Sequence, residues 1–344
     1  MHIAINLITE KESIKVSVII IAYQRREFII QAVKSAINQD LDKKEYEIIV
    51  VKNFADINID QFLHTNGIKS VLSHDTSIGS KFVEGIKMSK GEIICLLEDD
   101  DIFQPDKLSK VRSFFLKYPK LCYYHNNASF IDEDGDVIHN FDTISTRKLK
   151  GLGEIYIKDE EKNKNVFKLF NIGSYWNNSC ICIRKKFYLD FMATLSKIKS
   201  FFDGALFFGA LFSDGDILIG GDTLTHYRIN VSSATQKAKH NNVSHFNIAK
   251  TNTDDNLSIT QMVEHDLENK SRIFERLMVD RACWELKTVL YNISSTRIDG
   301  IKYFYYMITK YRVTIQFIRS NLLQLSGLLL FIISPGMSKK MALA

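Results

Sequence analysis

The sequence has little that breaks a chain: 3 prolines and 16 glycines occur among 344 residues. This scarcity argues against long disordered linkers, and with 45% hydrophobic residues the chain can bury one large core or two smaller ones. The five cysteines show no CxxC spacing, which argues against a zinc site, and their odd number predicts a reducing, cytoplasmic setting. A formal net charge of +5 without an arginine-rich tract gives no reason to expect nucleic acid as a partner.

Long uncharged apolar runs are also missing. Only a short apolar stretch precedes Glu10, so we expect no secretory signal peptide. The most apolar segment, 322–333, is shorter than the roughly 20 residues of a membrane span. Basic residues lie on both sides of it, at Lys310, Arg312, Arg319, Lys339 and Lys340. Three interpretations stay open for this segment: a packed core or oligomer helix, a helix lying on the inner face of the cell membrane, and a true span.

Strand-like and helix-like segments alternate through the first 120 residues. Apolar, β-branched runs typical of strands buried on both faces occur at 16–22, 47–51 and 92–97. Helical spacing of apolar residues is seen at 28–38, 81–88 and 106–117. This alternation predicts an α/β fold with a mostly parallel sheet flanked by helices. Because such sheets bind ligands beyond the carboxyl ends of their strands, we expect a crevice formed by the segments 22–25, 52–53 and 98–101.

Four consecutive carboxylates, from Glu98 to Asp101, follow directly on the last of these strands. Like charges at a strand end repel one another, and a divalent cation offsets that repulsion because hard cations prefer carboxylate oxygens. Such a cation can also carry a diphosphate and assist its departure. The alternative interpretation is an acidic turn that is simply solvated.

Six segments resemble, in order and spacing, the motifs of the family-two glycosyltransferases over about residues 15–235. They are Val16–Ala22 with Tyr23-Gln24-Arg25 (family SVIIPTYNR), Ser35–Gln39 (SVLNQ), Glu47–Val51 (EIIVVDD), Gly85-Ile86 with Lys90–Ile94 (GI…A.GEYI), Glu98–Asp101 with Pro105 and Lys107-Leu108 (DxDD…P.KL), and Tyr227–Ser233 (YRxHxxS). The resemblance implies the Rossmann-like GT-A fold over 1–235, with a nucleotide-sugar half at about 14–120 and an acceptor half at about 121–235. Residues 236–344 lie outside it and are predicted to form a helical C-terminal extension.

The resemblance implies an inverting glycosyltransferase that moves a sugar from a nucleotide-sugar donor to a glycan or lipid-linked glycan acceptor. It places the family's DxD motif on Glu98-Asp99-Asp100. Asp100 is the predicted ligand of Mg²⁺ or Mn²⁺, with Asp99 and Asp101 as close alternatives, and Glu98 and Asp99 are predicted donor contacts. Glu98 stands where the family has Asp, and the added methylene leaves its contact open.

The resemblance also implies a catalytic base in a segment that the family writes ED..L, which falls here on 202–206. Asp203 is therefore the candidate that takes the proton of the acceptor hydroxyl. The surrounding phenylalanines are expected to raise its pKa and so make it a better base. The alternative is an Asp that caps a helix, and three other residues compete for the role: Asp214, Asp216 and Asp222, which lie beside glycines typical of turns.

Donor contacts are predicted at the ends of the first two strands. Ala22, Tyr23 and Arg25 are expected to face the nucleotide, with Tyr23 stacking on the base and Arg25 pairing with phosphate. Where the family has an Asp after the second strand, this chain has Lys52 followed by Asn53. Lysine cannot accept a hydrogen bond from the base, but the amide oxygen of Asn53 can.

Two more contacts are predicted in the acceptor half. Arg228 is expected to close over the diphosphate, because a guanidinium grips phosphate oxygens in two places. Asn230 replaces the histidine of that motif. Trp176 is expected to line the acceptor site by stacking on a sugar.

Two other functions fit parts of the pattern. A sugar-1-phosphate nucleotidyltransferase shares a related fold but needs a glycine-rich phosphate loop after the first strand, and 22–26 contains no glycine. A non-catalytic relative that binds sugar or nucleotide stays open because of the changes at Lys52, Glu98 and Asn230.

Overall fold

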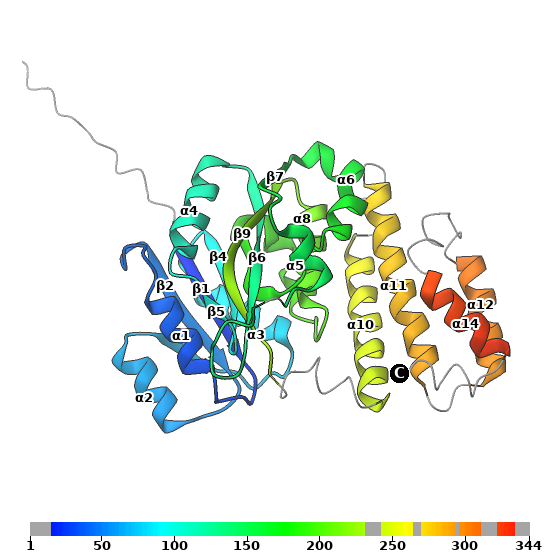
Figure 1. Ribbon diagram of the computed structural model, residues 1–344, viewed down its shortest axis with the longest axis horizontal. Helices are drawn as coiled ribbons and strands as arrows, with labels where there is room; N and C mark the ends of the chain where they lie inside the picture. Colours follow the sequence, from blue (N-terminus) through cyan, green and yellow to red (C-terminus); the bar gives the residue numbers. More distant parts are fainter. Residues whose placement is uncertain are drawn as a thin grey trace, which may run out of the picture.

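The computed structural model describes residues 15–139, 141–230, 242–263, 270–292, 296–310 and 322–333. Over these residues, nine strands form one sheet in the order β3-β2-β1-β4-β8-β6-β9-β5, with β7 paired to β9. Helices cover the sheet, and further helices extend to one side of it (Figure 1). This α/β architecture confirms the fold class predicted from the sequence.

The N-terminal part of the sheet is parallel. Its strands are β1 (Val16–Ala22), β2 (Tyr46–Lys52), β3 (Lys69–Leu72) and β4 (Ile93–Glu98), with β1 parallel to both β2 and β4. The helices that join them are α1 (Ile29–Ile37), α2 (Ile57–Thr65) and α3 (Ile78–Met88). Alternate residues of β1 pack on opposite sides: Val18 lies in one core cluster with α1, and Ile19 lies in the other with α3. Burial on both faces is what the continuous β-branched run predicts.

The second part of the sheet is mixed, because β8 pairs antiparallel with β4 and β6 whereas β6 and β9 are parallel. Its elements in chain order are β5 (Ile102–Phe103), α4 (Lys107–Lys117), β6 (Leu121–Ile131), α5 (Ile144–Leu149), β7 (Glu154–Ile157), α6 (Asp159–Asn171), η1 (Asn178–Cys180), β8 (Ile181–Arg184), η2 (Lys185–Phe191), α7 (Met192–Leu195), α8 (Phe202–Phe212) and β9 (Asp216–Arg228). Ten of the eleven residues of α8 are buried, and the exception is Asp203.

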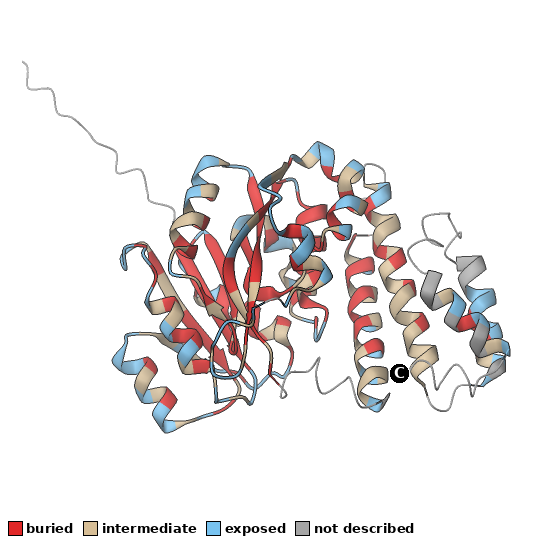
Figure 2. Ribbon diagram, in the orientation of Figure 1, coloured by how far each residue is buried: buried red, intermediate tan, exposed pale blue. Residues whose placement is uncertain are grey.

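The C-terminal region is helical, as predicted. Its helices are α10 (Asn242–Val263), α11 (Ser271–Tyr291), α12 (Arg297–Lys310) and α14 (Leu322–Ile333). α10 and α11 pack against each other beside α6 and α8, and α12 and α14 lie beyond them (Figure 1). Most of the α12 residues whose burial is described are exposed (Figure 2). In the described ranges, no helix is long and apolar enough to cross a membrane. The predicted domain boundary and the basic residues Arg312, Arg319, Lys339 and Lys340 lie outside the described residues.

Candidate active site

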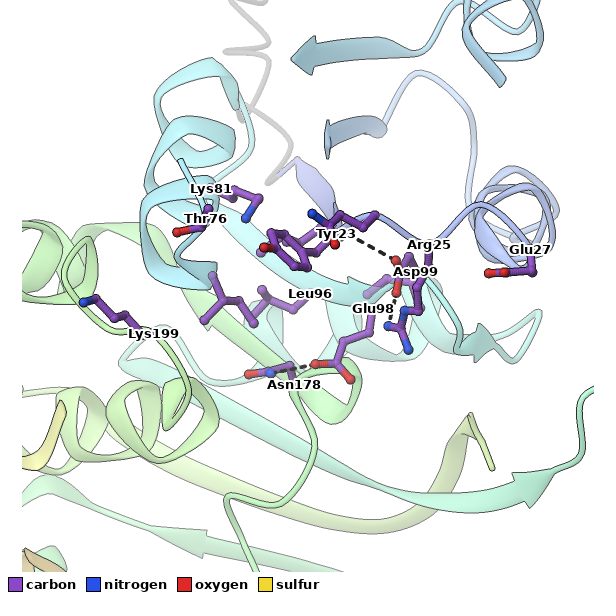
Figure 3. Close-up of a pocket in the computed structure, with 14 residues that line it drawn as sticks. Tyr23, Arg25, Glu27, Thr76, Lys81, Leu96, Glu98, Asp99, Asn178 and Lys199 are labelled. Atoms are coloured by element: carbon purple, nitrogen blue, oxygen red, sulfur yellow. Dashed lines mark hydrogen bonds and ion pairs between the residues drawn. The ribbon is translucent and has the colours of Figure 1, made fainter. Parts of the chain in front are cut away.

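The carboxyl ends of β1, β2 and β4 meet at one edge of the sheet, and a pocket of about 710 Å³ opens there. Tyr23 and Arg25 follow β1, whereas Glu98 and Asp99 come from the end of β4, and all four line the pocket (Figure 3). Gln24 between the first two has a φ of 59°, a left-handed conformation that side chains rarely adopt. The structure therefore brings together four predicted site residues that are about 75 positions apart in the chain.

The acidic segment is buried. Asp99, Asp100 and Asp101 are only 2%, 6% and 1% exposed, so the alternative of a solvated acidic turn is wrong. Arg25 bridges two of them: its Nη1 donates to Asp100 Oδ2 at 2.5 Å, and its Nη2 donates to Asp99 Oδ1. The backbone N–H of Tyr23 donates to the other oxygen of Asp99 at 3.4 Å. One arginine thus compensates two buried carboxylates.

Asp101 faces the protein. Its Oδ1 accepts a hydrogen bond from the backbone N–H of Arg228 at 3.0 Å, and its Oδ2 accepts one from Asn177 Nδ2 at 3.2 Å. Asp100 Oδ2 accepts a second bond from Asn230 Nδ2 at 2.8 Å. The asparagine that replaces the family's histidine is therefore in direct contact with the predicted metal ligand.

Burial and mutual repulsion change the acidity of this segment. Burial, together with the neighbouring carboxylates, raises the pKa of Glu98 to about 8. Burial likewise raises the pKa of Asp101 to about 7, and that of Asp99 to about 7 although Arg25 opposes the shift. Burial lowers the pKa of Arg25, but Asp99 and Asp100 raise it by more. The segment therefore gains stability when a positive charge lies beside it.

The donor atoms fit a divalent cation that arrives with a phosphate ligand. Among the described residues, no group of three or more His, Cys, Asp and Glu side chains converges on one point. Mg²⁺, however, is commonly held by one or two carboxylates and by the phosphates of its substrate. Asp99, which lines the pocket, and Asp100, which Arg25 bridges to it, provide two such carboxylates.

Asp203 lies in the first turn of α8, where the backbone N–H of Gly204 donates to its Oδ1 at 2.7 Å. Burial raises the pKa of Asp203 to about 6, the direction expected from its phenylalanine neighbours. Two of the three competing residues have structural partners: Asp216 accepts from the hydroxyl of Tyr156 and the backbone N–H of Asp159, and Asp222 pairs with Lys110 on the surface. Both belong to β9 rather than to turns.

Asn177 connects Asp203 to the acidic segment. Its backbone N–H bonds Asp203, and its side chain bonds Asp101. Its φ of 72° is the second positive value among the described non-glycine residues, and both such residues lie at this site. Next to it, Asn178 Nδ2 donates to Glu98 Oε1 at 2.9 Å (Figure 3). The sequence showed only two asparagines before a strand, and these long-range bonds have no local signal.

Two of the predicted nucleotide contacts, Ala22 and Asn53, do not line this pocket. Asn53 Oδ1 accepts from the backbone N–H of Gln24 at 2.8 Å, Lys52 binds Phe54 O and Asp60, and neither residue lines the pocket. Ala22 is fully buried and does not line it either. A residue that sequence reasoning missed lies there instead: Lys81, which is 1% exposed, with its Nζ 4.8 Å from the centroid of the Tyr23 ring. The sequence carried one signal for this residue, because Lys81 lies among the apolar positions of the segment that forms α3.

Arg228 makes four side-chain hydrogen bonds within the protein. Its guanidinium donates to the carbonyl oxygens of Asp100, Asp132 and Glu133 at 2.8 Å each and to Gln31 Oε1 at 2.7 Å. It is 1% exposed, so the predicted grip on a diphosphate would require these bonds to break. In the structure, Arg228 holds the backbone of the acidic segment through its bond to the carbonyl oxygen of Asp100.

Trp176 belongs to an aromatic cluster. Its ring centroid lies 5.2 Å from that of Tyr227 and 5.9 Å from that of Phe130. It is half-buried and does not line the pocket of Tyr23. Asp203 does not line that pocket either.

Comparison with known proteins agrees with this geometry. A family model described as glycosyl transferase family 2 matches residues 17–187. An uncharacterized glycosyltransferase of Rickettsia bellii (strain RML369-C) is 28% identical over 135 residues, which cover 38% of this chain. Those residues cover only 19% of the Rickettsia protein, so this chain spans a small part of that relative's length.

Solved structures of S. aureus TarS 1–349 are similar in fold. One aligns over 95% of this chain and 88% of the TarS chain, with a TM-score of 0.59 and 13% identity. The same fragment in complex with UDP-GlcNAc aligns over 93% and 82%, with a TM-score of 0.53 and 12% identity. The ordered motifs, the fold and the matched model together show that this chain belongs to glycosyl transferase family 2, as its sequence predicted.

Proposed function

We propose that this chain is an inverting glycosyltransferase that binds a nucleotide-sugar donor with Mg²⁺ or Mn²⁺ in the pocket of Tyr23 and transfers the sugar to a glycan or lipid-linked glycan. The observation that carries the proposal is the pocket itself, which joins an exposed aromatic ring and an arginine to two carboxylates at the edge of a parallel sheet. Tyr23 is 42% exposed and offers a ring face to the base.

Each residue of the site has a proposed role. Arg25 binds the diphosphate, and Asp99 and Asp100 hold the cation, which when bound stabilises the negative charge of the leaving diphosphate. Asp203 accepts the proton of the acceptor hydroxyl, and direct displacement from that side inverts the anomeric configuration. Asn177 supports this arrangement because it bonds both Asp101 and Asp203.

A panel of nucleoside diphosphates tests the donor site. We expect one of them, with Mn²⁺, to raise the melting temperature of the protein, because a ligand that binds only the folded state stabilises it. A TarS fragment was crystallised with UDP and with UDP-GlcNAc, so UDP compounds are the first to test. Release of free sugar from the matching donor separates an enzyme from a non-catalytic relative, which would bind without turnover.

Lys81 is proposed to read the base. Replacing it by methionine keeps the apolar stem and removes the ammonium, and we expect affinity for the nucleoside diphosphate to fall by about tenfold, as for a lost charged hydrogen bond. The affinity for inorganic pyrophosphate, measured by calorimetry, should not change, because pyrophosphate has no base. Lys87→Met on the exposed side of α3 is the matched control. An equal loss of affinity for the nucleoside diphosphate and for pyrophosphate would mean that Lys81 contacts the phosphates instead of the base.

A membrane contact is proposed for the C-terminal helices. Exposed residues at helical spacing form one face of α12: Ile298, Ile301, Lys302 and Tyr305. Apolar side chains beside a lysine suit an anionic membrane surface. We expect the double change Ile298→Glu and Ile301→Glu to reduce co-sedimentation with vesicles of anionic phospholipid by about tenfold. Ile57→Glu on α2, where the isoleucine is 82% exposed, is the control. Unchanged sedimentation would remove the proposal.

A further inference from the structure

Arg25 lies where the sequence predicts a metal ion. Its two terminal nitrogens reach one oxygen each of Asp99 and Asp100, the carboxylates expected to hold the cation. Asp100 Oδ2, which Arg25 contacts, also accepts from Asn230. A cation that approaches these oxygens therefore meets an existing positive charge and occupied acceptor sites.

Exposure shows which partner faces the solvent. The side chain of Arg25 is 27% exposed, whereas those of Asp99 and Asp100 are 2% and 8% exposed. Figure 3 shows the guanidinium of Arg25 beside Asp99. The guanidinium thus covers the carboxylates on the side from which a ligand arrives.

The backbone that carries Arg25 is held independently of its side chain. Gln24 donates to Asn53 and Tyr23 donates to Asp99, both through backbone N–H groups. The arginine can therefore change partners by side-chain rotation, while the strained turn stays in place. The pocket beside it has room for a diphosphate, and a guanidinium pairs with phosphate through two parallel hydrogen bonds, as it does with carboxylate.

We infer that Arg25 is a built-in counterion which a divalent cation must displace from Asp100, so that cation and donor bind well only together. The inference rests on the proposed function. In this scheme the diphosphate of the donor pairs with Arg25 in place of the carboxylates and would supply further ligands to the cation. Asp99 and Asp100 would then be free to hold the metal. Arg25 is a positioning residue in this scheme: it keeps the buried acidic segment neutralised in the free enzyme and couples the two ligands.

The test is Mn²⁺ binding to the full chain, measured by the electron paramagnetic resonance of free Mn²⁺, with and without saturating UDP. For the wild type we expect weak binding alone and at least about tenfold tighter binding with UDP. Arg25→Gln removes the competing charge, so we expect at least about tenfold tighter Mn²⁺ binding without UDP and little further gain with it. Arg26→Gln removes an equal charge at a half-exposed site that pairs with Asp56, and should behave as the wild type.

Equal Mn²⁺ affinity of Arg25→Gln and wild type without UDP would overturn the inference, as would wild-type binding that ignores UDP. If Arg25→Gln does not fold, Arg25→Lys keeps the charge but bridges one carboxylate at a time, so its Mn²⁺ affinity without UDP should exceed that of the wild type. A value at or below that of the wild type would again contradict the inference. Failure of the proposed function is distinguishable, because a wild type that binds none of the nucleoside diphosphates in the panel, with or without Mn²⁺, has no donor site.

Discussion

Replacing Asp203 by asparagine should lower the rate of transfer by about 10²–10⁴-fold, the usual contribution of a general base. Asparagine has the same shape and can still accept the hydrogen bond from Gly204 N, but it cannot take a proton. Donor affinity should stay unchanged, because Asp203 does not line the pocket of Tyr23. Initial rates at saturating donor and Mn²⁺, with calorimetry of UDP binding, measure the two quantities separately.

The pH dependence of the wild type should report the same carboxylate. Only the ionised form accepts a proton, so the rate is expected to rise as the pH increases through about 6. Stability changes in the opposite direction. Because the folded-state pKa lies above the unfolded value near 3.9, the ionised form is disfavoured in the fold, and stability falls as the pH rises between these two values. Asp203→Asn removes that contribution, so the melting temperature of the variant should fall less than that of the wild type as the pH rises through this range.

Asp222→Asn is the matched control for this prediction. The sequence placed Asp222 among the competing bases, but the structure pairs it with Lys110 on the exposed side of β9. We expect full activity from this variant. Full activity of Asp203→Asn together with loss in Asp222→Asn, or in Asp216→Asn at unchanged stability, would move the base to β9.

The fold could be predicted where the residues of a segment determine its secondary structure by themselves. The run Val16–Ala22 forms β1 with the predicted bounds, because seven consecutive buried residues leave no other arrangement for β-branched side chains. α3 begins at Ile78 rather than at the predicted residue 81, because Ser77 caps it through a bond from Ser80 N. The sheet is less parallel than predicted, since β8 returns antiparallel beside β4.

The site was predictable only in part. Tyr23, Arg25 and the acidic segment each follow a strand, so strand ends alone were enough to bring them together. The bonds of Arg228 to Asp132 and Glu133, and those of Asn177 to Asp101 and Asp203, join distant segments and depend on tertiary packing. Sequence patterns show which residue types are present, but which partner a buried donor chooses is decided by the assembled fold.

Replacing Asp100 by alanine should remove the effect of the metal on donor binding. Asp100 is the least buried of the three aspartates in the acidic segment and the one that Arg25 and Asn230 both reach. We expect Mn²⁺ to tighten UDP binding to the wild type by about 10–100-fold and to have no effect on the variant. Transfer should fall by about 10²–10³-fold, since loss of a metal ligand removes several kcal/mol of charge stabilisation at the leaving group. Calorimetry of UDP with Mn²⁺ or with a chelator measures the first effect.

Asp101→Asn separates a metal ligand from a structural carboxylate. Asp101 accepts hydrogen bonds from Arg228 N and from Asn177 Nδ2. An asparagine at this position keeps one of these bonds through its amide oxygen, but its NH₂ group then faces the other N–H donor. We expect a loss of stability of about 1–3 kcal/mol, the usual penalty for a broken buried bond, with the response to Mn²⁺ retained. If instead Asp101→Asn loses the Mn²⁺ response while Asp100→Ala keeps it, Asp101 is the ligand, and Arg228 must then move to make it accessible.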